Sequence, residues 1–498
     1  MDPFRKGLTL LAVLCLFAAG CAAISSRQNV PPFGRPSECL SFFENLDQEI
    51  ETAGVRNAAD FPVPGFPYLR TNRFLEALGP RLKADAEKDS WVRWMQELDL
   101  QGRRAEIRNL PEKAVQTLSG KKNGEEAREE LSARVSSCSE KLREHDQGGK
   151  DFFSLVHSRI YIPDEYSTFL RVVGVHPLTA IPVALVTEKA RVKFQKWFEG
   201  DVAKIPVEGK LKRYFPREKS FLDQGQISRI LSDSRHHFLN LPRPKRADLE
   251  RLARAFAPVI VQDTAAPFDE VGRVVWKGDQ IEVFPDQPAV YYYFSQAFMN
   301  GEPILQIQYV IWYGARNGAK PPWFERGHLD GLTIRFSLDP RGMPFMVDIM
   351  NNCGCYHLFA PDRARVNQVL VPSAATPPFV PQNLPKIEGG ELLGLRVNSG
   401  WHQVQRLSPV REANGAVPYE LLPYEALESL PTGNGPGKSI FDSEGIVPGT
   451  ERSERFFLFP MGVPSVGSMR QRGHHAIDFI GRVHFDDPNL FERNFILK

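Results

Sequence analysis

Apolar residues recur every three or four positions through the first half of the chain, a spacing that gathers them on one face of a helix. The clearest stripe consists of Leu40, Phe43, Leu46 and Ile50. A proline–serine pair precedes this stripe and Gly54 follows it, as expected at the two ends of a helix. Similar stripes continue to about residue 150. Together they predict a mainly helical domain over 36–255.

Two prolines change the expectation for one part of this region. The stretch HPLTAIPVAL, 176–185, contains Pro177 and Pro182. Proline inside a helix removes a hydrogen-bond donor and clashes with the preceding turn, so we predict an extended connector here. The residues that follow, VTEKARVKFQKWFEGD, carry a broad apolar face and predict a helix that begins near Val186.

From about residue 257 apolar and polar residues alternate, as they do along half-buried strands. The pattern is carried by segments such as PILQIQYVIWYG, DGLTIRFSLDPRGMPFMVDIM and, near the end, ERFFLFP and HAIDFIGRVHFD. Two stretches, 361–390 and 408–450, are rich in proline and glycine and are expected to be long loops. The predicted fold class is α+β, a helical N-terminal domain followed by an antiparallel β-sandwich or barrel-like C-terminal domain over 256–498.

The first residues, MDPFRKGLTLLAVLCLFAAGC, combine a short basic segment with an apolar run. The run from Leu8 to Ala19 has the length of a signal-peptide core and is too short to span a bilayer. Small residues directly precede Cys21, an arrangement that resembles the lipobox of bacterial lipoprotein precursors. The resemblance implies a signal peptide over 1–21, acylation of Cys21 and a tether over 22–35. An ordinary cleaved secretion signal is the alternative.

The same resemblance implies where the protein acts. Because no Asp follows Cys21, the expected location is the periplasmic face of the outer membrane, with the lipid as anchor. No later stretch reaches about 18 consecutive apolar residues, so no transmembrane helix is predicted downstream. A net charge of +2 gives no electrostatic reason for nucleic-acid binding. The expected partners are therefore the membrane and other envelope proteins or glycans.

Six cysteines become four if Cys15 leaves with the signal peptide and Cys21 carries the lipid. Four cysteines in an oxidising envelope allow two disulfides, with three possible connectivities. Cys39 and Cys138 both lie in helical patterns of one region, and we predict a disulfide between them. Such a bridge closes a loop of about 100 residues and contributes about 4–5 kcal/mol in the chain-entropy model.

The other two cysteines lie in MVDIMNNCGCYHLFAP, 346–361, which holds three metal-binding side chains at alternate positions. Residues i and i+2 of a strand share a face and can converge on one ion. One hypothesis is therefore a divalent transition-metal site, with zinc as the example. The expected ligands are His328, Asp330, Cys355, His357, His474 and His475. Glu325 or Asp478 would act as the catalytic base.

Two other interpretations of the Cys-Gly-Cys sequence stay open. Cys353 and Cys355 would form a redox pair if a disulfide closed the small, strained ring across Gly354, since strain makes such a bond easy to reduce. No thioredoxin-like βαβ pattern surrounds the two cysteines, which argues against an oxidoreductase. The third interpretation is structural, with an inert disulfide or two buried thiols beside a hydrogen-bonded His357.

Two hypotheses about function follow. The first is a lipid-anchored, metal-dependent envelope hydrolase that uses the residues named above. The second is a non-catalytic envelope lipoprotein that binds or organises other envelope components through its long loops. The chain contains no G-x-S-x-G, P-loop, strand-associated GxGxxG or H-E-x-x-H motif, so the protein classes that those motifs mark are not indicated.

Overall fold

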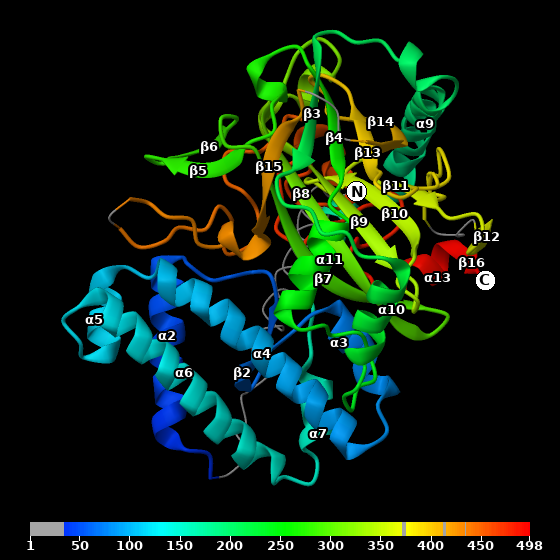
Figure 1. Ribbon diagram of the computed structural model, residues 1–498. Coiled ribbons are helices and arrows are strands. Elements are labelled where there is room, and N and C mark those ends of the chain that lie inside the picture. Colours follow the sequence, from blue (N-terminus) through cyan, green and yellow to red (C-terminus); the bar gives the residue numbers. More distant parts are fainter. Residues whose placement is uncertain (1–33, 371–374, 412–414, 434) are drawn as a thin grey trace, which may run out of the picture.

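The computed structural model describes residues 34–370, 375–411, 415–433 and 435–498. It has an α+β fold, in which a group of helices lies below a part built around a large curled sheet (Figure 1). Cys21, the signal peptide and most of the expected tether lie outside the described residues. Arg35, the last residue of that tether, is buried and pairs with Asp146 at 2.6 Å. Among the described helices, none combines the length and the apolar character that a membrane span requires.

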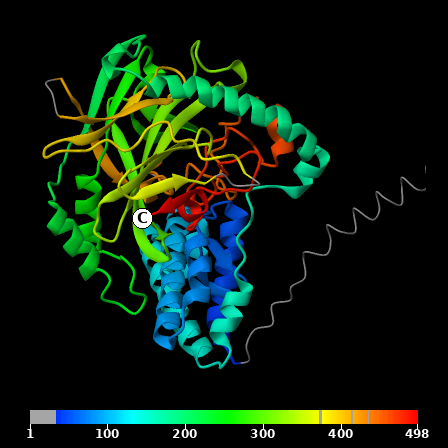
Figure 2. The same cartoon turned by 90° about the vertical axis from the view of Figure 1, so that its right-hand side faces the viewer.

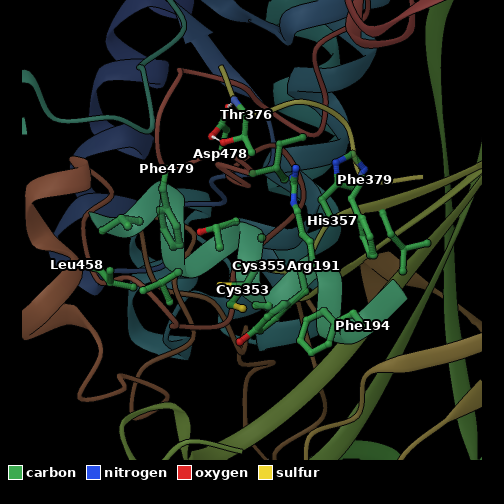
Figure 3. A pocket seen from close by; sticks show the side chains of 18 of the residues that line it. Arg191, Phe194, Cys353, Cys355, His357, Thr376, Phe379, Leu458, Asp478 and Phe479 are labelled. Carbon is green, nitrogen blue, oxygen red and sulfur yellow. Dashed lines mark hydrogen bonds between the residues drawn. The ribbon is translucent and has the colours of Figure 1, made fainter. Parts of the chain in front are cut away.

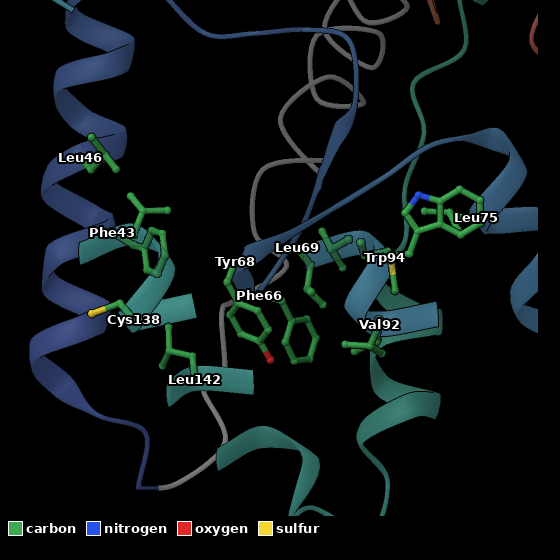
Figure 4. Packing of buried hydrophobic residues seen from close by; sticks show 14 of the residues in the cluster. Phe43, Leu46, Phe66, Tyr68, Leu69, Leu75, Val92, Trp94, Cys138 and Leu142 are labelled. Carbon is green, nitrogen blue, oxygen red and sulfur yellow. The ribbon is translucent and has the colours of Figure 1, made fainter. Parts of the chain in front are cut away.

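In the described residues before 160, helices and a short hairpin pack their apolar stripes into one core (Figure 4). The helices are α2 (Ser37–Ala53), α3 (Arg73–Leu78), α4 (Asp85–Asn109), α5 (Glu112–Ser119), α6 (Gly124–Gln147) and α7 (Phe152–Arg159). The hairpin strands are β1 (Phe61–Val63) and β2 (Phe66–Thr71). Phe43, Leu46, Trp94 and Leu142 are all buried in this core, as their helical spacing predicts.

A disulfide joins Cys39 of α2 to Cys138 of α6, which is the pairing predicted from the sequence. The two Cα atoms are 5.2 Å apart, although 99 positions separate the residues along the chain. Both cysteines are buried within the core of this helical part. The bridge therefore ties together two helices that lie far apart in sequence.

Four further α-helices lie in the described residues 160–256: α8 (Thr168–Val173), α9 (His176–Gln195), α10 (Gln224–Asp233) and α11 (Arg246–Ala255). Of these, α9 contradicts the sequence prediction, because it includes the segment expected to be an extended connector. Pro177 lies in the first turn, where proline costs no helical hydrogen bond. Pro182 lies inside the helix and removes one donor without ending it.

Within the described residues, ten strands form the large sheet. They are β3 (Lys210–Pro216), β4 (Val259–Thr264), β7 (Ala289–Met299), β8 (Glu302–Arg316), β9 (Gly327–Leu338), β10 (Pro344–Asn351), β11 (Leu358–Pro361), β13 (Leu392–Val397), β14 (Val404–Val410) and β15 (Val417–Pro423). Their order across the sheet is β11-β10-β9-β8-β7-β15-β3-β4-β13-β14. The long strands β7 to β10 form the antiparallel hairpins that the alternation predicts.

The sheet is mixed, so the prediction of a wholly antiparallel sandwich or barrel is wrong. The pairs β7–β15, β15–β3 and β4–β13 are parallel. They arise because β3 comes from the segment predicted to be mainly helical, and because β15 returns to the middle of the sheet after long loops. Alternation along one strand shows which side chains share a face, but it carries no information about the direction of the neighbouring strand.

Smaller elements surround the sheet. They are β5 (Arg273–Lys277) paired with β6 (Gln280–Phe284), β12 (Val366–Val369) paired with β16 (Phe495–Leu497), α12 (Arg455–Leu458), the 3-10 turn η8 (Phe459–Met461) and α13 (Leu490–Asn494). Thus ERFFLFP, predicted to be a strand, forms α12 and part of η8. HAIDFIGRVHFD is also no strand, and in it the described structure has one bridge, between Ala476 and His484.

The helical part and the sheet part share a buried interface. The Asn57 side-chain amide donates to Glu428 at 2.9 Å, and Arg472 contacts the same carboxylate at 3.0 Å. Phe74 of α3 stacks on Phe298 of β7 with ring centroids 5.1 Å apart. The interface therefore combines hydrogen bonds and ion pairs with apolar stacking, and together these contacts hold the two parts in one relative position.

Candidate functional site

A cavity of about 720 Å³ lies beneath α9, between that helix and the end of the sheet formed by β10 and β11 (Figure 3). We call it the α9 cavity. The wall that α9 supplies consists of Pro182, Val183, Val186, Thr187, Ala190, Arg191 and Phe194. Most other lining residues are apolar, among them Phe379, Leu458 and Phe479. Cavities of roughly 300–1,000 Å³ with apolar walls and a few polar groups are the usual sites for small ligands.

The turn that connects β10 to β11 places two sulfur atoms and an imidazole at this cavity. Cys353, Cys355 and His357 all line it. Gly354 has a φ of 86°, and a Cβ atom there would lie 2.4 Å from the carbonyl oxygen of Ala476, so only glycine fits. The metal hypothesis placed Cys355 and His357 on one face of a strand, but this segment is a turn, so the spacing of the two residues gives them no shared strand face.

Cys353 and Cys355 are free thiols that lie next to each other on one side of the cavity (Figure 3). Burial raises the pKa of Cys353, but a hydrogen bond with Cys355 and the positive charges of Arg316 and Arg452 outweigh burial and lower it to about 6. That hydrogen bond and burial both raise the pKa of Cys355. Near neutral pH the pair therefore holds one proton, with the negative charge on Cys353.

Alkylation of Cys353 by N-ethylmaleimide is expected to have its midpoint near pH 6, because the thiolate is the reacting form. Cys355→Ala removes the hydrogen-bond donor and should move the midpoint upward, whereas Cys355→Ser keeps a donor and should move it less. Peptide mass spectrometry on reduced protein between about pH 5 and 9 measures the modified fraction. Equal midpoints in the native chain and in Cys355→Ala would show that the two thiols share no proton.

A buried network of charged side chains lies behind the thiols. Arg316 donates to the two Asp330 oxygens at 2.9 and 3.0 Å and to Glu325 at 3.0 Å. His402 lies between Asp330 and Asp269, at nitrogen–oxygen distances of 2.8 and 3.0 Å. Burial lowers the pKa of His402, but the bonds to its two carboxylate partners outweigh this effect and raise it. The network therefore favours the charged imidazolium.

Glu325 connects this network to the cavity. Its carboxylate accepts from the Tyr356 hydroxyl at 2.6 Å and from the Trp401 indole at 2.9 Å, and all three residues line the cavity. Among the described residues, Leu329, Tyr356 and His402 are three of the seven non-glycine positions with positive φ. Strained backbone of this kind gathers at functional sites, where surrounding contacts must hold it in place.

Two buried polar side chains near the thiols carry atoms without a hydrogen-bond partner in the described structure. These atoms are Oε1 of Glu454 and both Nε and Nη1 of Arg452. Burial, followed by the charge of Cys353, raises the pKa of Glu454 to about 8. Glu454 also lines the cavity. It is therefore a neutral acid near pH 7 in the wall of the cavity.

His357 and Asp478 occupy another part of the cavity wall. His357 Nε2 lies 2.8 Å from Asp348, which also accepts two bonds from Arg335 at 2.9 and 2.6 Å. Burial lowers the pKa of His357 despite the bond to Asp348. Asp478 accepts from the backbone amide and the hydroxyl of Thr376, at 2.7 and 2.5 Å. Protein donors thus hold both carboxylates, and this arrangement fixes the wall.

The predicted ligands His328 and Asp330 lie in different surroundings. Where β8 pairs with β9, a bulge sets both His328 and Leu329 opposite Ala315. A bulge shifts the alternation of side chains, so it removes the shared face that i, i+2 spacing predicts. His328 is exposed, with Nε2 2.8 Å from the carbonyl oxygen of Ile281, whereas Asp330 is buried in the charged network.

His474 and His475 also have separate partners. His474 lies between Glu165 and the carbonyl oxygen of Ala58, at 2.9 and 2.7 Å. His475 Nε2 is 3.2 Å from the carbonyl oxygen of Asn352. In the part of the chain that the structure describes, no group of three or more His, Cys, Asp or Glu side chains is arranged to hold a metal ion. The residues present do not fit the hypothesised zinc site, and we derive no metal-dependent step.

The structure does bring some of the predicted residues together, since one cavity is lined by Glu325, Cys353, Cys355, His357 and Asp478. No sequence motif marks the other members of the site: Asp269, Arg316, Trp401, His402, Arg452 and Glu454. One sequence signal points to these residues, namely a charged residue next to a long apolar strand segment, such as Arg316 as the last residue of β8. Their mutual contacts depend on folding, because up to 133 positions separate the partners.

Comparison with protein-family models, curated proteins and solved structures finds no match for this chain. No residue role can therefore be carried over from a relative, and the function is inferred from the α9 cavity.

Proposed function

We propose that this protein is a lipid-anchored envelope protein that binds a neutral, single-chain amphiphile in the α9 cavity. The observation that carries the proposal is the cavity itself, about 720 Å³ with mostly apolar walls and a few polar groups at the cysteine turn. Such walls favour an alkyl chain, because each methylene group removed from water contributes about 0.8 kcal/mol. The anchor at Cys21 and the location at the periplasmic face of the outer membrane are proposed from the N-terminal sequence.

The polar groups around the thiols favour an uncharged end on the ligand. Glu454 is a neutral acid near pH 7, since its pKa is about 8, and it can both donate and accept a hydrogen bond. The Cys353 thiolate and the Glu325 carboxylate place negative charge on the same side of the cavity. Arg316 and Arg452 offset part of this charge, but a carboxylate or phosphate would still add like charge beside the two anions, so an ester, an amide or an alcohol is favoured. Monoacylglycerols combine such groups with one alkyl chain.

This proposal develops the non-catalytic hypothesis drawn from the sequence, but it puts the binding site in a different part of the chain. Binding was expected in the long loops, but the proposed site lies beneath α9. Of the long loops, mainly residues 376–379 line it. The zinc-dependent hydrolase stays a hypothesis without further support, since the side chains expected as ligands bond to other partners.

Titration calorimetry with 1-lauroylglycerol tests the proposal, using the full chain with Cys21→Ser so that no acyl group occupies that position. We expect one molecule bound per chain with a negative change in heat capacity, because apolar surface leaves water on binding. Laurate should bind at least about tenfold more weakly near pH 7 because of its charge. If 1-lauroylglycerol gives no saturable heat below its micelle concentration, the proposal fails.

A further inference from the structure

The solvent-facing side of α8 and α9 is apolar, whereas a surface helix ordinarily turns its polar side to water. Large apolar side chains that are 52–72 % exposed there are Phe169, Val172, Val173, Val175, Leu178, Ile181, Leu185, Val186 and Val192. Along α9, the outward stripe of Leu178, Ile181 and Leu185 keeps helical spacing. Figure 2 shows this helix on the outside of the sheet part. Nothing in the described structure covers the stripe.

Exposed aromatic rings continue this apolar surface beyond α9. They are Trp323, Phe456, Phe457 and Phe459, which are 63, 66, 58 and 38 % exposed. The Arg171 guanidinium of α8 donates to the carbonyl oxygen of Met461 in η8 at 2.9 Å, which holds the two segments together. The rings of Trp323 and Phe457 are 5.9 Å apart, and Figure 2 shows α12 beside α9. We call the combined surface the α9 face.

Charge is distributed along this surface in two blocks. The stretch 172–187 contains no Asp, Glu, Lys or Arg. The following turns of helix expose Lys189, Lys193 and Lys196 against a single acid, Glu188, so the three cations and one anion leave a net charge of +2. An uncharged apolar surface flanked by cations matches the boundary between the acyl chains and the anionic headgroups of a membrane.

We propose that the α9 face docks onto an anionic phospholipid membrane, with α9 lying in the plane of the interface. An exposed apolar patch that extends over α8, α9 and the neighbouring aromatic rings marks an interaction surface. The cationic flank indicates which partner covers it. The same face of a second copy carries a single acid, Glu188, and so offers the cationic flank little opposite charge in any orientation. An anionic bilayer instead offers apolar depth and opposite charge in the same order as the helix. α9 contributes 20 residues, or about 30 Å of contact length.

The α9 face and the α9 cavity share side chains. Val186 and Phe457 are exposed on the face and also line the cavity. A docked protein would therefore receive its amphiphile directly from the bilayer, between α9 and α12. This entry route rests on the proposed function, whereas docking itself does not.

Vesicle sedimentation tests the docking, again with the full chain carrying Cys21→Ser. The triple variant Leu178→Ser, Ile181→Ser, Leu185→Ser removes the outward stripe and spares the cavity lining. The matched control Phe221→Ser, Phe238→Ser removes two apolar side chains that are 76 and 69 % exposed outside the α9 face. All chains share the same first 33 residues, so a difference between them arises from the substituted surface.

We expect the native chain and the control to bind phosphatidylglycerol-containing vesicles, and the triple variant to lose at least about tenfold in partition coefficient. Binding to pure phosphatidylcholine should be weaker, and Lys189→Glu with Lys196→Glu should weaken binding to the anionic vesicles. Equal binding of the triple variant and the control would overturn the proposal. So would a native dimer that the triple variant disrupts and that binds no vesicles.

The failure of docking and the failure of ligand binding are separable in this design. If the triple variant keeps its affinity for 1-lauroylglycerol and loses the vesicles, docking is supported independently of the cavity. If the native chain binds vesicles but not 1-lauroylglycerol, the docking stands and the proposed function fails.

Discussion

Replacing Asp330 with alanine is expected to lower the free energy of unfolding by about 3–5 kcal/mol, the cost of leaving buried cations without their partner. Asp330 is fully buried and contacts Arg316 at 2.9 Å, Arg452 at 3.2 Å and His402 at 2.8 Å. Urea unfolding monitored by circular dichroism measures the loss. Asp279→Ala is the matched control, since Asp279 is exposed and its pair with Lys438 spans 3.6 Å, so it should cost less than about 1 kcal/mol.

The pH dependence of stability gives a second readout for the same residue. Burial raises the pKa of Asp330, but its cationic partners outweigh burial and hold it well below its usual range. The stability that Asp330 contributes is therefore present above about pH 4 and is lost as the pH falls through the folded-state pKa. Asp330→Asn should flatten this acid dependence while it keeps the side-chain volume. If Asp330→Ala and Asp279→Ala unfold at the same urea concentration, the buried network does not hold the site together.

Filling the α9 cavity is expected to abolish most ligand binding. Ala190→Trp places an indole into space that a ligand would occupy, because Ala190 lines the cavity from α9. We expect the affinity for 1-lauroylglycerol to fall by about 10- to 100-fold, equivalent to about 1.4–2.8 kcal/mol. Leu185→Trp is the control on the same helix, since Leu185 is 60 % exposed and does not line the cavity.

The calorimetric titration described above measures both variants. Native affinity in Leu185→Trp together with the loss in Ala190→Trp would place the ligand in the cavity and not on the outside of α9. Unchanged affinity in a folded Ala190→Trp chain would place the ligand elsewhere.

Local patterns predict part of this fold well. The stripes of α2 and α6 place Phe43, Leu46 and Leu142 in the core, and they also bring Cys39 close to Cys138. Alternation likewise locates the long hairpins β7 to β10. What local patterns do not contain is strand direction and order, because the neighbours of β3 and β15 come from distant segments.

Two segments were predicted wrongly for the same reason: their apolar residues are not buried in a core. The prolines of α9 led to the prediction of a connector, but the segment is a helix. Its apolar residues do not follow the pattern of a surface helix, because they face a cavity on one side and solvent on the other. Likewise Phe456 and Phe457 resemble buried strand residues in sequence, yet they are largely exposed. Hydropathy alone does not distinguish burial in a core from contact with a membrane or a ligand.

The sequence predicted the turn that carries the two cysteines of the candidate site, but not the buried network of charged side chains behind it. The Cys-Gly-Cys sequence marks the place where Cys353 and Cys355 enter the cavity wall. The expected partners of these cysteines were histidines, but a bulge at Leu329 and separate hydrogen-bond partners keep those apart. Arg316 and Arg452 lie behind the thiols instead, and their charges act on Cys353.

The position of a bromine atom tests the central claim most directly. Crystals of the Cys21→Ser chain grown with 1-(12-bromododecanoyl)glycerol should show an anomalous peak inside the α9 cavity, against apolar lining residues such as Phe194 or Phe379. The glycerol end should lie within hydrogen-bond distance of Glu454. Bromine found only on the outer side of α9, or nowhere in ordered density while the cavity holds water alone, would contradict the account.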